Sequence, residues 1–163
     1  LFKGTVEENL RMAKPDATKE EMEAVLQKVN LLGFLQTQNG LQTELLEKAG
    51  NLSGGQCQRL VIARALLRSD SAVYIFDEAA SNIDVESEEL IMNVIHELAK
   101  TKTVLLISHR LANVVQSDQI YFLKNGTICE RGTHAELMEQ NGAYCHLYDS
   151  QMVLENYGKE GNA

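Results

Sequence analysis

Two acidic residues, Asp77 and Glu78, stand directly after the short apolar run Val73 to Phe76. A continuous apolar run of this length predicts a strand that is buried on both faces of a parallel sheet. Carboxylates at the carboxyl end of such a strand lie on the side where α/β sheets bind ligands. Asp77 is therefore a candidate ligand of Mg²⁺, which prefers hard oxygen atoms, and Glu78 can orient or deprotonate a water for attack on phosphorus. Taken alone, an acidic pair that closes a strand is common.

A second segment with possible chemistry is Ser53-Gly54-Gly55-Gln56, which we expect at the start of a helix. The first backbone N–H groups of a helix have no partner inside the helix. Because glycine lets a phosphate approach the backbone, and because the helix dipole is positive at this end, the segment is a candidate anion cradle. An ordinary capped helix after a glycine-rich loop has the same local sequence.

His109 follows Ser108 just beyond a second apolar run, Thr103 to Ile107. Since this run is predicted to be another strand of the sheet, we expect His109 on the same edge as Asp77 and Glu78. An imidazole there can donate to phosphate oxygens and help to position the attacking water. A lone histidine is more often structural, so this prediction depends on the three side chains occurring together.

The hydrophobic pattern predicts the elements that position these side chains. The first third of the chain is helical, with a capping box at Thr18-Lys19-Glu20-Glu21, and another helix begins at Ser53. Apolar residues at helical spacing between Val85 and Lys100 separate the two predicted strands, which gives a strand–helix–strand unit. We therefore expect a helical portion followed by part of an α/β core.

The last third is predicted to contain a hairpin and two helical stretches. Asn125-Gly126 lies between strand-like runs at 120–123 and 127–130, and a tight primed turn needs the positive φ that these two residues tolerate. A short helix is capped at Thr133, residues 138–157 have a mostly helical pattern, and residues 158–163 are expected to form a frayed tail.

Composition disfavours several classes of protein. The 163 residues are 44% hydrophobic and 23% charged, which is ordinary for a soluble domain, and the net charge of −8 argues against a nucleic-acid binder. Cys57, Cys129 and Cys145 form no C-x-x-C pair, so we expect reduced thiols. No apolar run is long enough to span a bilayer, and no signal peptide is visible. The chain begins with Leu1 rather than Met, and we expect it to be excised from a longer protein.

Together these segments resemble the motifs of the ATP-binding domains of ABC transporters. Residues 52–56 resemble the signature motif, 73–78 the Walker B motif, 81–84 the D-loop and 108–110 the H-loop, in the order and at the intervals of that family. The resemblance covers nearly the whole chain. It implies an α/β fold with part of a P-loop NTPase (RecA-like) parallel sheet. Residues 1–68 would be the α-helical subdomain with the signature helix, and residues 69–163 the C-terminal half of the RecA-like core.

The resemblance also implies a role for each motif. Asp77 would hold Mg²⁺, Glu78 would be the catalytic carboxylate, and His109 would sense the γ-phosphate of ATP. A second ATP-binding domain would pair head to tail with this one. The residues expected to reach ATP across that interface, or to communicate across it, are Ser53, Gly54, Gly55 and Gln56 of the signature and Ser81 and Asp84 of the D-loop.

The function implied by the resemblance is ATP-driven export. MgATP would close the dimer, hydrolysis would reopen it, and transmembrane domains would move a substrate, which places the chain at the cytoplasmic face of the cell membrane. No nucleic acid is expected as a partner. One alternative is a soluble ABC-type ATPase that acts on DNA or ribosomes, but the coiled coils, zinc modules or basic linkers of that class are not visible here. Another is a non-catalytic α/β regulatory domain, which would not need Glu78 and His109 at two strand ends.

A phosphate-binding P-loop, G-x-x-x-x-G-K-[ST], does not occur in the 163 residues. The only Gly-Lys pair, Gly158-Lys159, has Val153 where the first glycine should stand and Glu160 in place of Ser or Thr. Residues 1–10 resemble the stretch that follows the Q-loop glutamine in exporters. The P-loop (Walker A), the adenine-stacking aromatic residue and the Q-loop are therefore expected upstream, and the chain alone is predicted not to hydrolyse ATP.

Two positions depart from the pattern of the family. Cys57 stands where a long polar or basic side chain usually follows the signature glutamine, and Leu46 replaces a glycine common in the X-loop, which faces the transmembrane domains in exporters. Residues 110–115 and 151–157 resemble the cysteine/glutathione exporters linked to cytochrome bd assembly. Because Glu78 is present, the chain would contribute the competent Walker B half of its dimer.

Overall fold

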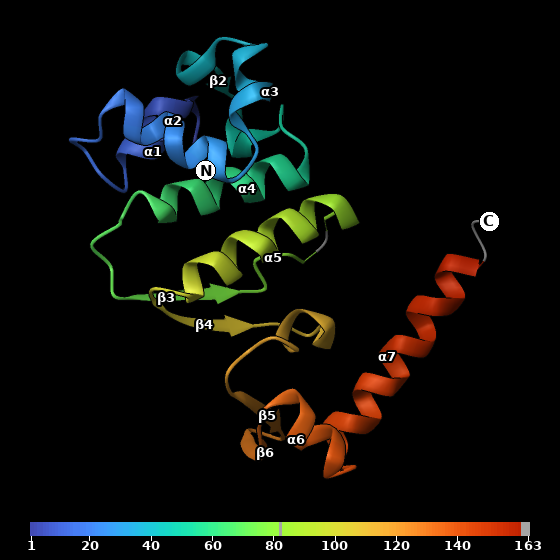
Figure 1. The fold of residues 1–163 in the computed structure, drawn as a ribbon. Coiled ribbons are helices and arrows are strands. Elements are labelled where there is room, and N and C mark those ends of the chain that lie inside the picture. Colours follow the sequence, from blue (N-terminus) through green and yellow to red (C-terminus); the bar gives the residue numbers. More distant parts are fainter. Residues whose placement is uncertain (82, 161–163) are drawn as a thin grey trace. The chain divides into compact units, whose positions relative to one another are not determined.

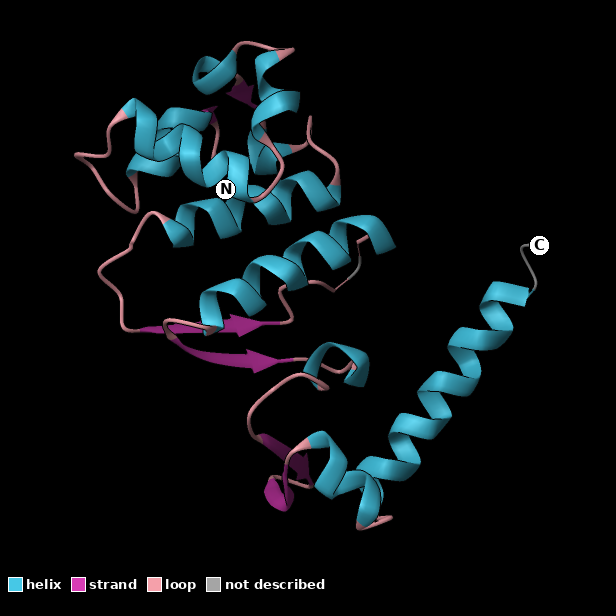
Figure 2. Cartoon of the chain, in the orientation of Figure 1, coloured by secondary structure: helices cyan, strands magenta, loops and turns pink. Residues whose placement is uncertain are grey.

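The computed structural model describes residues 1–81 and 83–160 and has the expected mixed α/β architecture (Figures 1 and 2). The backbone forms two compact units, Leu1–Ile107 and Ser108–Ala163. The elements of the first unit are β1 (Gly4–Thr5), α1 (Val6–Arg11), α2 (Lys19–Lys28), α3 (Leu32–Gln36), β2 (Glu44–Leu45), α4 (Gly54–Leu66), β3 (Val73–Asp77), α5 (Val85–Ala99) and β4 (Thr103–Ile107). Those of the second unit are β5 (Ile120–Lys124), β6 (Thr127–Gly132), α6 (His134–Glu139) and α7 (Ala143–Glu160).

Capping boxes start three helices of the first unit. The side chains of Thr5, Thr18 and Ser53 each accept a hydrogen bond from the backbone N–H three residues on, and the side chain of that later residue accepts from the backbone of the cap. A cap of this kind stabilises a helix by about 1 kcal/mol. The predicted capping box at Thr18 and the predicted helix start at Ser53 are confirmed.

The helices of the first unit share one apolar core. Helix α4 packs against α1, α2 and α5, so the helix that begins after Ser53 lies between the N-terminal helices and α5 (Figure 1). The fully buried side chains of this core include Leu10, Met22, Leu26, Leu31, Leu35, Leu60 and Ile91. Burial of each such side chain contributes about 1.5–3 kcal/mol, which holds the first turn of α4 in a fixed place.

Strands β3 and β4 form the predicted parallel pair, with α5 as the helix that connects them. Val73 pairs with Thr103 and Asp77 pairs with Ile107. The carboxyl ends of both strands therefore lie at the same edge. One face of the pair carries the buried rings of Tyr74 and Phe76, and α5 packs against β4.

The opposite face of this strand pair is exposed. It is lined by Val73, Ile75, Leu105 and Ile107, which are 55%, 66%, 49% and 47% exposed. Successive side chains of a strand point to opposite faces, and the described residues cover one face only. The expectation that the strands are buried on both faces is therefore wrong for the part of the chain that the structure describes.

We expect this exposed apolar face to make the chain self-associate, because both faces of a parallel sheet are normally covered. Ile75→Glu should shift the 163-residue chain toward the monomer, as measured by light scattering over a range of concentrations. Val85→Glu is the matched control, since Val85 is also 66% exposed but lies on α5. A chain that stays monomeric at high concentration would contradict this expectation.

The second unit begins with the predicted hairpin. Strands β5 and β6 pair antiparallel, and the turn residues Asn125 and Gly126 have φ of 52° and 76°. These values fit a primed turn, whose twist matches that of the flanking strands. The predicted cap at Thr133 is also confirmed, since its hydroxyl accepts from the backbone N–H of Glu136 at the start of α6.

The helical pattern predicted over residues 138–157 is divided between two helices. Helix α6 ends at Glu139 and α7 begins at Ala143, after Asn141 with a φ of 49°. The carboxylate of Glu130 on β6 accepts hydrogen bonds from the backbone N–H groups of Ala143 (2.6 Å) and Tyr144 (3.0 Å). A Cβ added at Gly142 would lie 2.7 Å from this carboxylate. A contact with a distant strand therefore fixes the start of α7, which local pattern did not predict.

Helix α7 continues to Glu160, so the tail expected from residue 158 is helical as far as the described residues extend, and residues 161–163 lie outside them. The compact units divide after Ile107, whereas α1 to α4 all lie within residues 1–68. The assignment of residues 1–68 and 69–163 to two subdomains stays a prediction. Over residues 1–81 and 83–160, no helix combines the length and the apolar character that crossing a bilayer requires.

Candidate functional site

The acidic pair lies where the sequence predicted it, at the carboxyl edge of the β3–β4 pair. Asp77 is the last residue of β3, Glu78 is the next residue, and both are exposed. The backbone N–H of Glu78 donates to the carbonyl of Ile107 at 2.9 Å, which continues the strand ladder by one bond. Two carboxylates are thus presented to solvent on a backbone held by the sheet.

Glu78 has a positive φ of 48°, an uncommon conformation for a residue with a side chain. This conformation costs about 1 kcal/mol. It turns the chain sharply after β3, and the turn is closed by a hydrogen bond from the backbone N–H of Ser81 to the carbonyl of Glu78 at 3.0 Å. Ala79 and Ala80 are buried inside the turn. The strained backbone therefore belongs to an exposed acidic residue, a combination typical of functional positions.

The signature segment forms the first turn of α4. Ser53 is the N-cap, its hydroxyl accepts from the backbone N–H of Gln56 at 3.2 Å, and the Gln56 side chain accepts from the N–H of Ser53 at 2.9 Å. Ser53 and Gly54 are exposed, whereas Gly55 is buried. Because the cap uses the Ser53 oxygen as an acceptor, its hydroxyl proton can still be donated to an anion. The exposed end of the turn fits the predicted anion cradle.

The structure brings Gly55 against the start of α5, where the D-loop ends. Asp84 is the N-cap of α5 and accepts from the backbone N–H of Ser87 at 2.8 Å. A Cβ added at Gly55 would overlap the Ser87 hydroxyl, and it would lie 2.8 Å from Ser87 Cβ and 3.1 Å from Asp84 Oδ2. Two segments predicted to face a partner domain, the signature and the D-loop, are therefore in direct contact within one chain.

Hydrogen bonds from the backbone N–H and the hydroxyl of Ser87 hold the pKa of the Asp84 carboxyl below its ordinary value. Asp84 therefore stays ionised at neutral pH and caps α5 as an anion at the positive end of the helix dipole. Ser81 is half-buried in the same loop. Asn82, which belongs to the predicted D-loop motif, lies outside the described residues.

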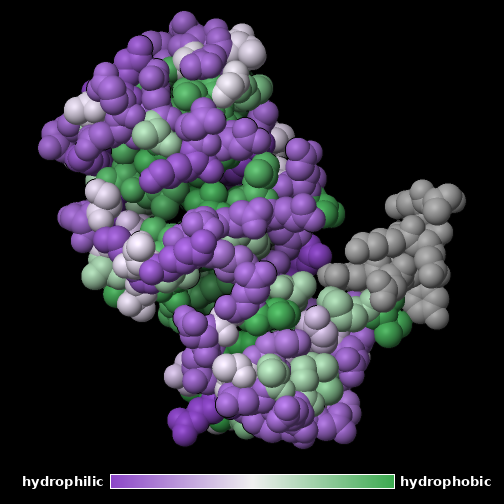
Figure 3. Space-filling view, viewed as in Figure 1, coloured by the Kyte–Doolittle hydropathy of each residue, from purple (hydrophilic) through white to green (hydrophobic). Residues whose placement is uncertain are grey.

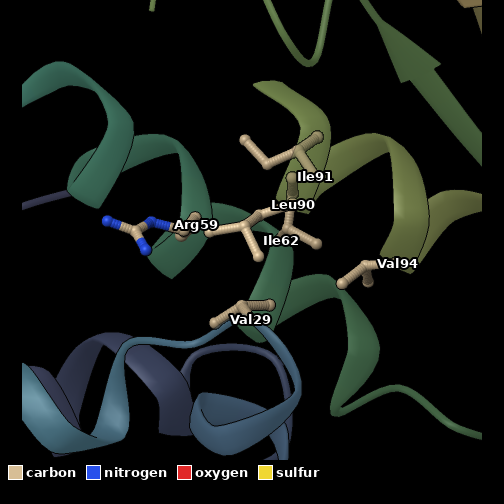
Figure 4. Close-up of a pocket in the computed structure, with 6 residues that line it drawn as sticks. All are labelled: Val29, Arg59, Ile62, Leu90, Ile91 and Val94. Atoms are coloured by element: carbon tan, nitrogen blue, oxygen red, sulfur yellow. The ribbon is translucent and has the colours of Figure 1, made fainter. Parts of the chain in front are cut away.

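Arg59 ties the signature helix to the N-terminal helices. Its Nε donates to the carbonyl of Gly55 at 3.3 Å, and its Nη1 donates to the carbonyl of Asn30 at 3.1 Å. The stem of Arg59 also borders a shallow groove between α4 and α5, with the apolar side chains Val29, Ile62, Leu90, Ile91 and Val94 as the other lining residues (Figure 4).

A band of apolar side chains follows this seam between α4 and α5 (Figure 3). The groove of Figure 4 is too narrow to hold a water molecule. We therefore regard it as the packing seam of the two helices and not as a ligand pocket.

His109 follows the end of β4 by two residues and belongs to the second unit. It is exposed, its backbone carbonyl accepts from the side chain of Gln151 at 2.8 Å, and Arg110 N–H donates to the Ser108 hydroxyl at 3.1 Å. The expectation that His109 lies on the same edge as Asp77 and Glu78 stays a prediction.

The residues present fit the groups that the resemblance implied. Mg²⁺ in phosphate-transferring sites is held by one or two carboxylates together with phosphate oxygens and water, and Asp77 supplies an exposed carboxylate at a sheet edge. The first turn of α4 offers a hydroxyl and backbone N–H groups to a phosphate. No P-loop sequence that would hold phosphates occurs in the 163 residues.

Sequence reasoning did not single out Ser87, Arg59 or Gln151. Ser87 had a local signal, because Asp84 and Ser87 have the spacing of an N-cap and its third helical residue. Arg59 and Gln151 act through backbone carbonyls 29 and 42 residues away in the sequence, and no local pattern predicts such contacts.

Comparison with known proteins identifies the family. The family model described as ABC transporter matches residues 1–81. An ABC transporter ATP-binding protein of Haemophilus influenzae is 52% identical over 163 residues, which is all of this chain and 29% of that protein. An ATP-dependent lipid A-core flippase of Vibrio vulnificus is 44% identical over 93% of this chain and 26% of its own length.

A solved structure agrees with these relatives. The structure of a bacterial Atm1-family ABC exporter with ATP bound matches 93% of this chain with a TM-score of 0.84 and 31% identity, over 26% of that exporter chain. The chain thus spans less than a third of the length of each of these relatives. Sequence and fold agree, and the chain belongs to the ATP-binding domains of ABC transporters.

Proposed function

We propose that this chain is the part of an ABC exporter that carries the signature, Walker B, D-loop and H-loop residues, and that it couples ATP hydrolysis to transport across a membrane. The observation that carries this proposal is the Asp77-Glu78 pair, exposed at the carboxyl edge of two parallel strands. It occurs in a chain whose relatives are named as ABC transporter and flippase proteins. A soluble ATPase that acts on DNA or ribosomes is not favoured by these relatives.

In this proposal the residues of the Walker B, H-loop and signature motifs act on MgATP. Asp77 holds Mg²⁺, which supplies charge neutralisation at the phosphate oxygens. Glu78 orients the attacking water and accepts its proton, and His109 donates to the γ-phosphate. Ser53, Gly54, Gly55 and Gln56 contact ATP bound on a second ATP-binding domain, and Ser81 and Asp84 face that domain. A firm backbone supports the acidic pair, because the Glu78 N–H is bonded to β4.

The proposed partners are a second ATP-binding domain, identical or different, and the transmembrane domains of the exporter. This places the chain at the cytoplasmic face of the cell membrane. A narrower proposal, export of cysteine or glutathione, rests on the resemblance of residues 110–115 and 151–157 to that subgroup. The P-loop that holds the phosphates of ATP would come from outside these 163 residues.

The 163-residue chain alone is expected to bind MgATP too weakly for detection and to release no phosphate, because backbone amides and a lysine of a P-loop supply most phosphate contacts. Calorimetric titration with MgATP and a phosphate-release assay measure this. The full-length protein, assayed in parallel, should hydrolyse ATP in the presence of Mg²⁺. No hydrolysis by the full-length protein would overturn the proposed function. Tight binding and turnover by the 163-residue chain would show that it holds a complete site.

A further inference from the structure

The side chain of Gln151 on α7 bridges two backbone groups of the loop that carries His109. Its Oε1 accepts from the backbone N–H of Leu111 at 2.9 Å, and its Nε2 donates to the backbone carbonyl of His109 at 2.8 Å. A carboxamide is the side-chain group that offers an acceptor and a donor side by side for this purpose. The bridge spans 40 and 42 residues of sequence, so it is a tertiary contact.

The backbone N–H of Leu111 in this loop finds its hydrogen-bond acceptor in Gln151. Leu111 begins a short 3-10 turn, Leu111–Val114, whose N-cap Arg110 makes no side-chain capping hydrogen bond. The first N–H of such a turn has no partner inside it, and Gln151 supplies the acceptor. Leu111 and Val114 are buried beneath the turn. Gln151 therefore acts as the cap of this turn and fixes the residue that precedes it by two positions, His109.

Gln151 is itself held in place from the other end of α7. The Glu130 carboxylate caps the first turn of the helix through Ala143 and Tyr144. The Tyr144 ring is fully buried, its hydroxyl lies 2.8 Å from Nδ1 of His134, and it contacts Phe122 edge to face. A helix anchored at its start presents a residue two turns later at a defined position, so the bridge rests on a fixed support.

We propose that Gln151 is a positioning residue for His109, which holds the backbone of the H-loop so that the imidazole meets the γ-phosphate at a constant place. This inference rests on the proposed function of His109 as the group that contacts the γ-phosphate. It assigns to α7 an indirect part in hydrolysis, through His109. Positioning through the backbone affects the transition state more than the binding of ATP, because a displaced donor costs most where charge develops.

The test uses the full-length protein with Gln151→Glu and Gln151→Ala. Glu keeps the volume and the acceptor but replaces the donor with an oxygen that faces the His109 carbonyl. Loss of one or two backbone hydrogen bonds corresponds to about a tenfold effect. We expect kcat for ATP hydrolysis to fall about tenfold in both variants, with KM for ATP changed less than about twofold. Gln140→Glu is the matched control, because Gln140 is exposed on the loop after α6. Its kcat and KM for ATP hydrolysis should be close to those of the wild type.

Two further measurements separate positioning from a general loss of structure. In a His109→Ala background, Gln151→Glu should have no added effect on kcat, since it acts through His109. Hydrogen exchange of residues 108–114 should be faster in Gln151→Glu than in the wild type, whereas exchange in β5 and β6 stays the same. The exchange result tests the bridge without reference to activity. An inactive wild-type protein would overturn the proposed function. An active wild type with normal kcat in Gln151→Glu, or with equal effects of Gln151→Glu in the presence and absence of His109, would overturn the positioning role.

Discussion

Glu78→Gln in the full-length protein is expected to lower the rate of ATP hydrolysis by about 10²–10⁴-fold, the usual contribution of a general base. Gln has nearly the same size as Glu, and it would occupy the same backbone conformation with φ of 48°. The turn after β3 and the bond from residue 78 to Ile107 are therefore retained. The loss would come from chemistry and not from folding. Because ATP binding does not need this carboxylate, ATP-bound dimers should accumulate.

The rate is measured by steady-state phosphate release, and the dimers by size-exclusion chromatography with ATP. Glu89→Gln is the matched control, since Glu89 is an exposed carboxylate on α5 that belongs to none of the predicted site motifs. That variant should hydrolyse ATP at the wild-type rate. A near-normal rate of ATP hydrolysis in Glu78→Gln would contradict the assignment of Glu78 as the catalytic carboxylate.

Gly55→Ala is expected to destabilise the protein by about 1–3 kcal/mol, the usual cost of overpacking, and to lower ATP hydrolysis by about tenfold or more. The added methyl group would overlap the Ser87 hydroxyl and lie 2.8 Å from Ser87 Cβ. Rotation of the serine side chain can move the hydroxyl, but it cannot move Cβ. The starts of α4 and α5 must therefore separate, which displaces the signature and the D-loop together.

The contact can be tested by compensation. Ser87→Gly removes the two nearest atoms that the new methyl group would meet and leaves Asp84 Oδ2, at 3.1 Å, as the third. It keeps the backbone N–H that Asp84 accepts from. Glycine in a helix costs about 1 kcal/mol relative to alanine, so Ser87→Gly alone is mildly destabilising. The double variant Gly55→Ala with Ser87→Gly should be no less stable than Ser87→Gly, and it should recover activity relative to Gly55→Ala.

Gly33→Ala is the matched control for this experiment, because Gly33 lies on α3 with no atom within 4 Å of an added Cβ. It should leave stability unchanged or slightly raised. Unfolding is followed by thermal denaturation and activity by phosphate release. A double variant that loses the sum of the two single losses would show that Gly55 and Ser87 do not interact as the structure has them.

Local sequence predicted most of the elements around the candidate site. The strand that ends at Asp77 and the helix start at Ser53 were predictable because each has a local cause, an apolar run in one case and a capping residue in the other. The Asn125-Gly126 hairpin was predictable for the same reason, since only a few residue types tolerate its positive φ values.

The predictions were wrong where segments distant in the sequence determine burial or the end of a helix. The strand Val73–Asp77 has the apolar run of a strand buried on both faces, yet Ile75 is 66% exposed. Composition fixes which side chains can be buried, and the number of layers around the sheet fixes which ones are. The helical pattern predicted over 138–157 likewise ran through Asn141 and Gly142, where the structure has a break between two helices. Local pattern did not show this break, because the Glu130 carboxylate that caps the start of α7 comes from a strand earlier in the chain.

The sequence by itself determined the family and the types of residue at the candidate site. Asp77, Glu78 and His109, with the Ser53-Gly54-Gly55-Gln56 segment, are recognisable because phosphate chemistry restricts residue types and spacings. Only the tertiary structure decided how these residues are supported. The contact of Gly55 with Ser87, the bond from Arg59 to the carbonyl of Asn30 and the bridge from Gln151 to His109 join residues far apart in the chain. Such contacts depend on the path of the backbone in space, and a local pattern of residues does not contain that information.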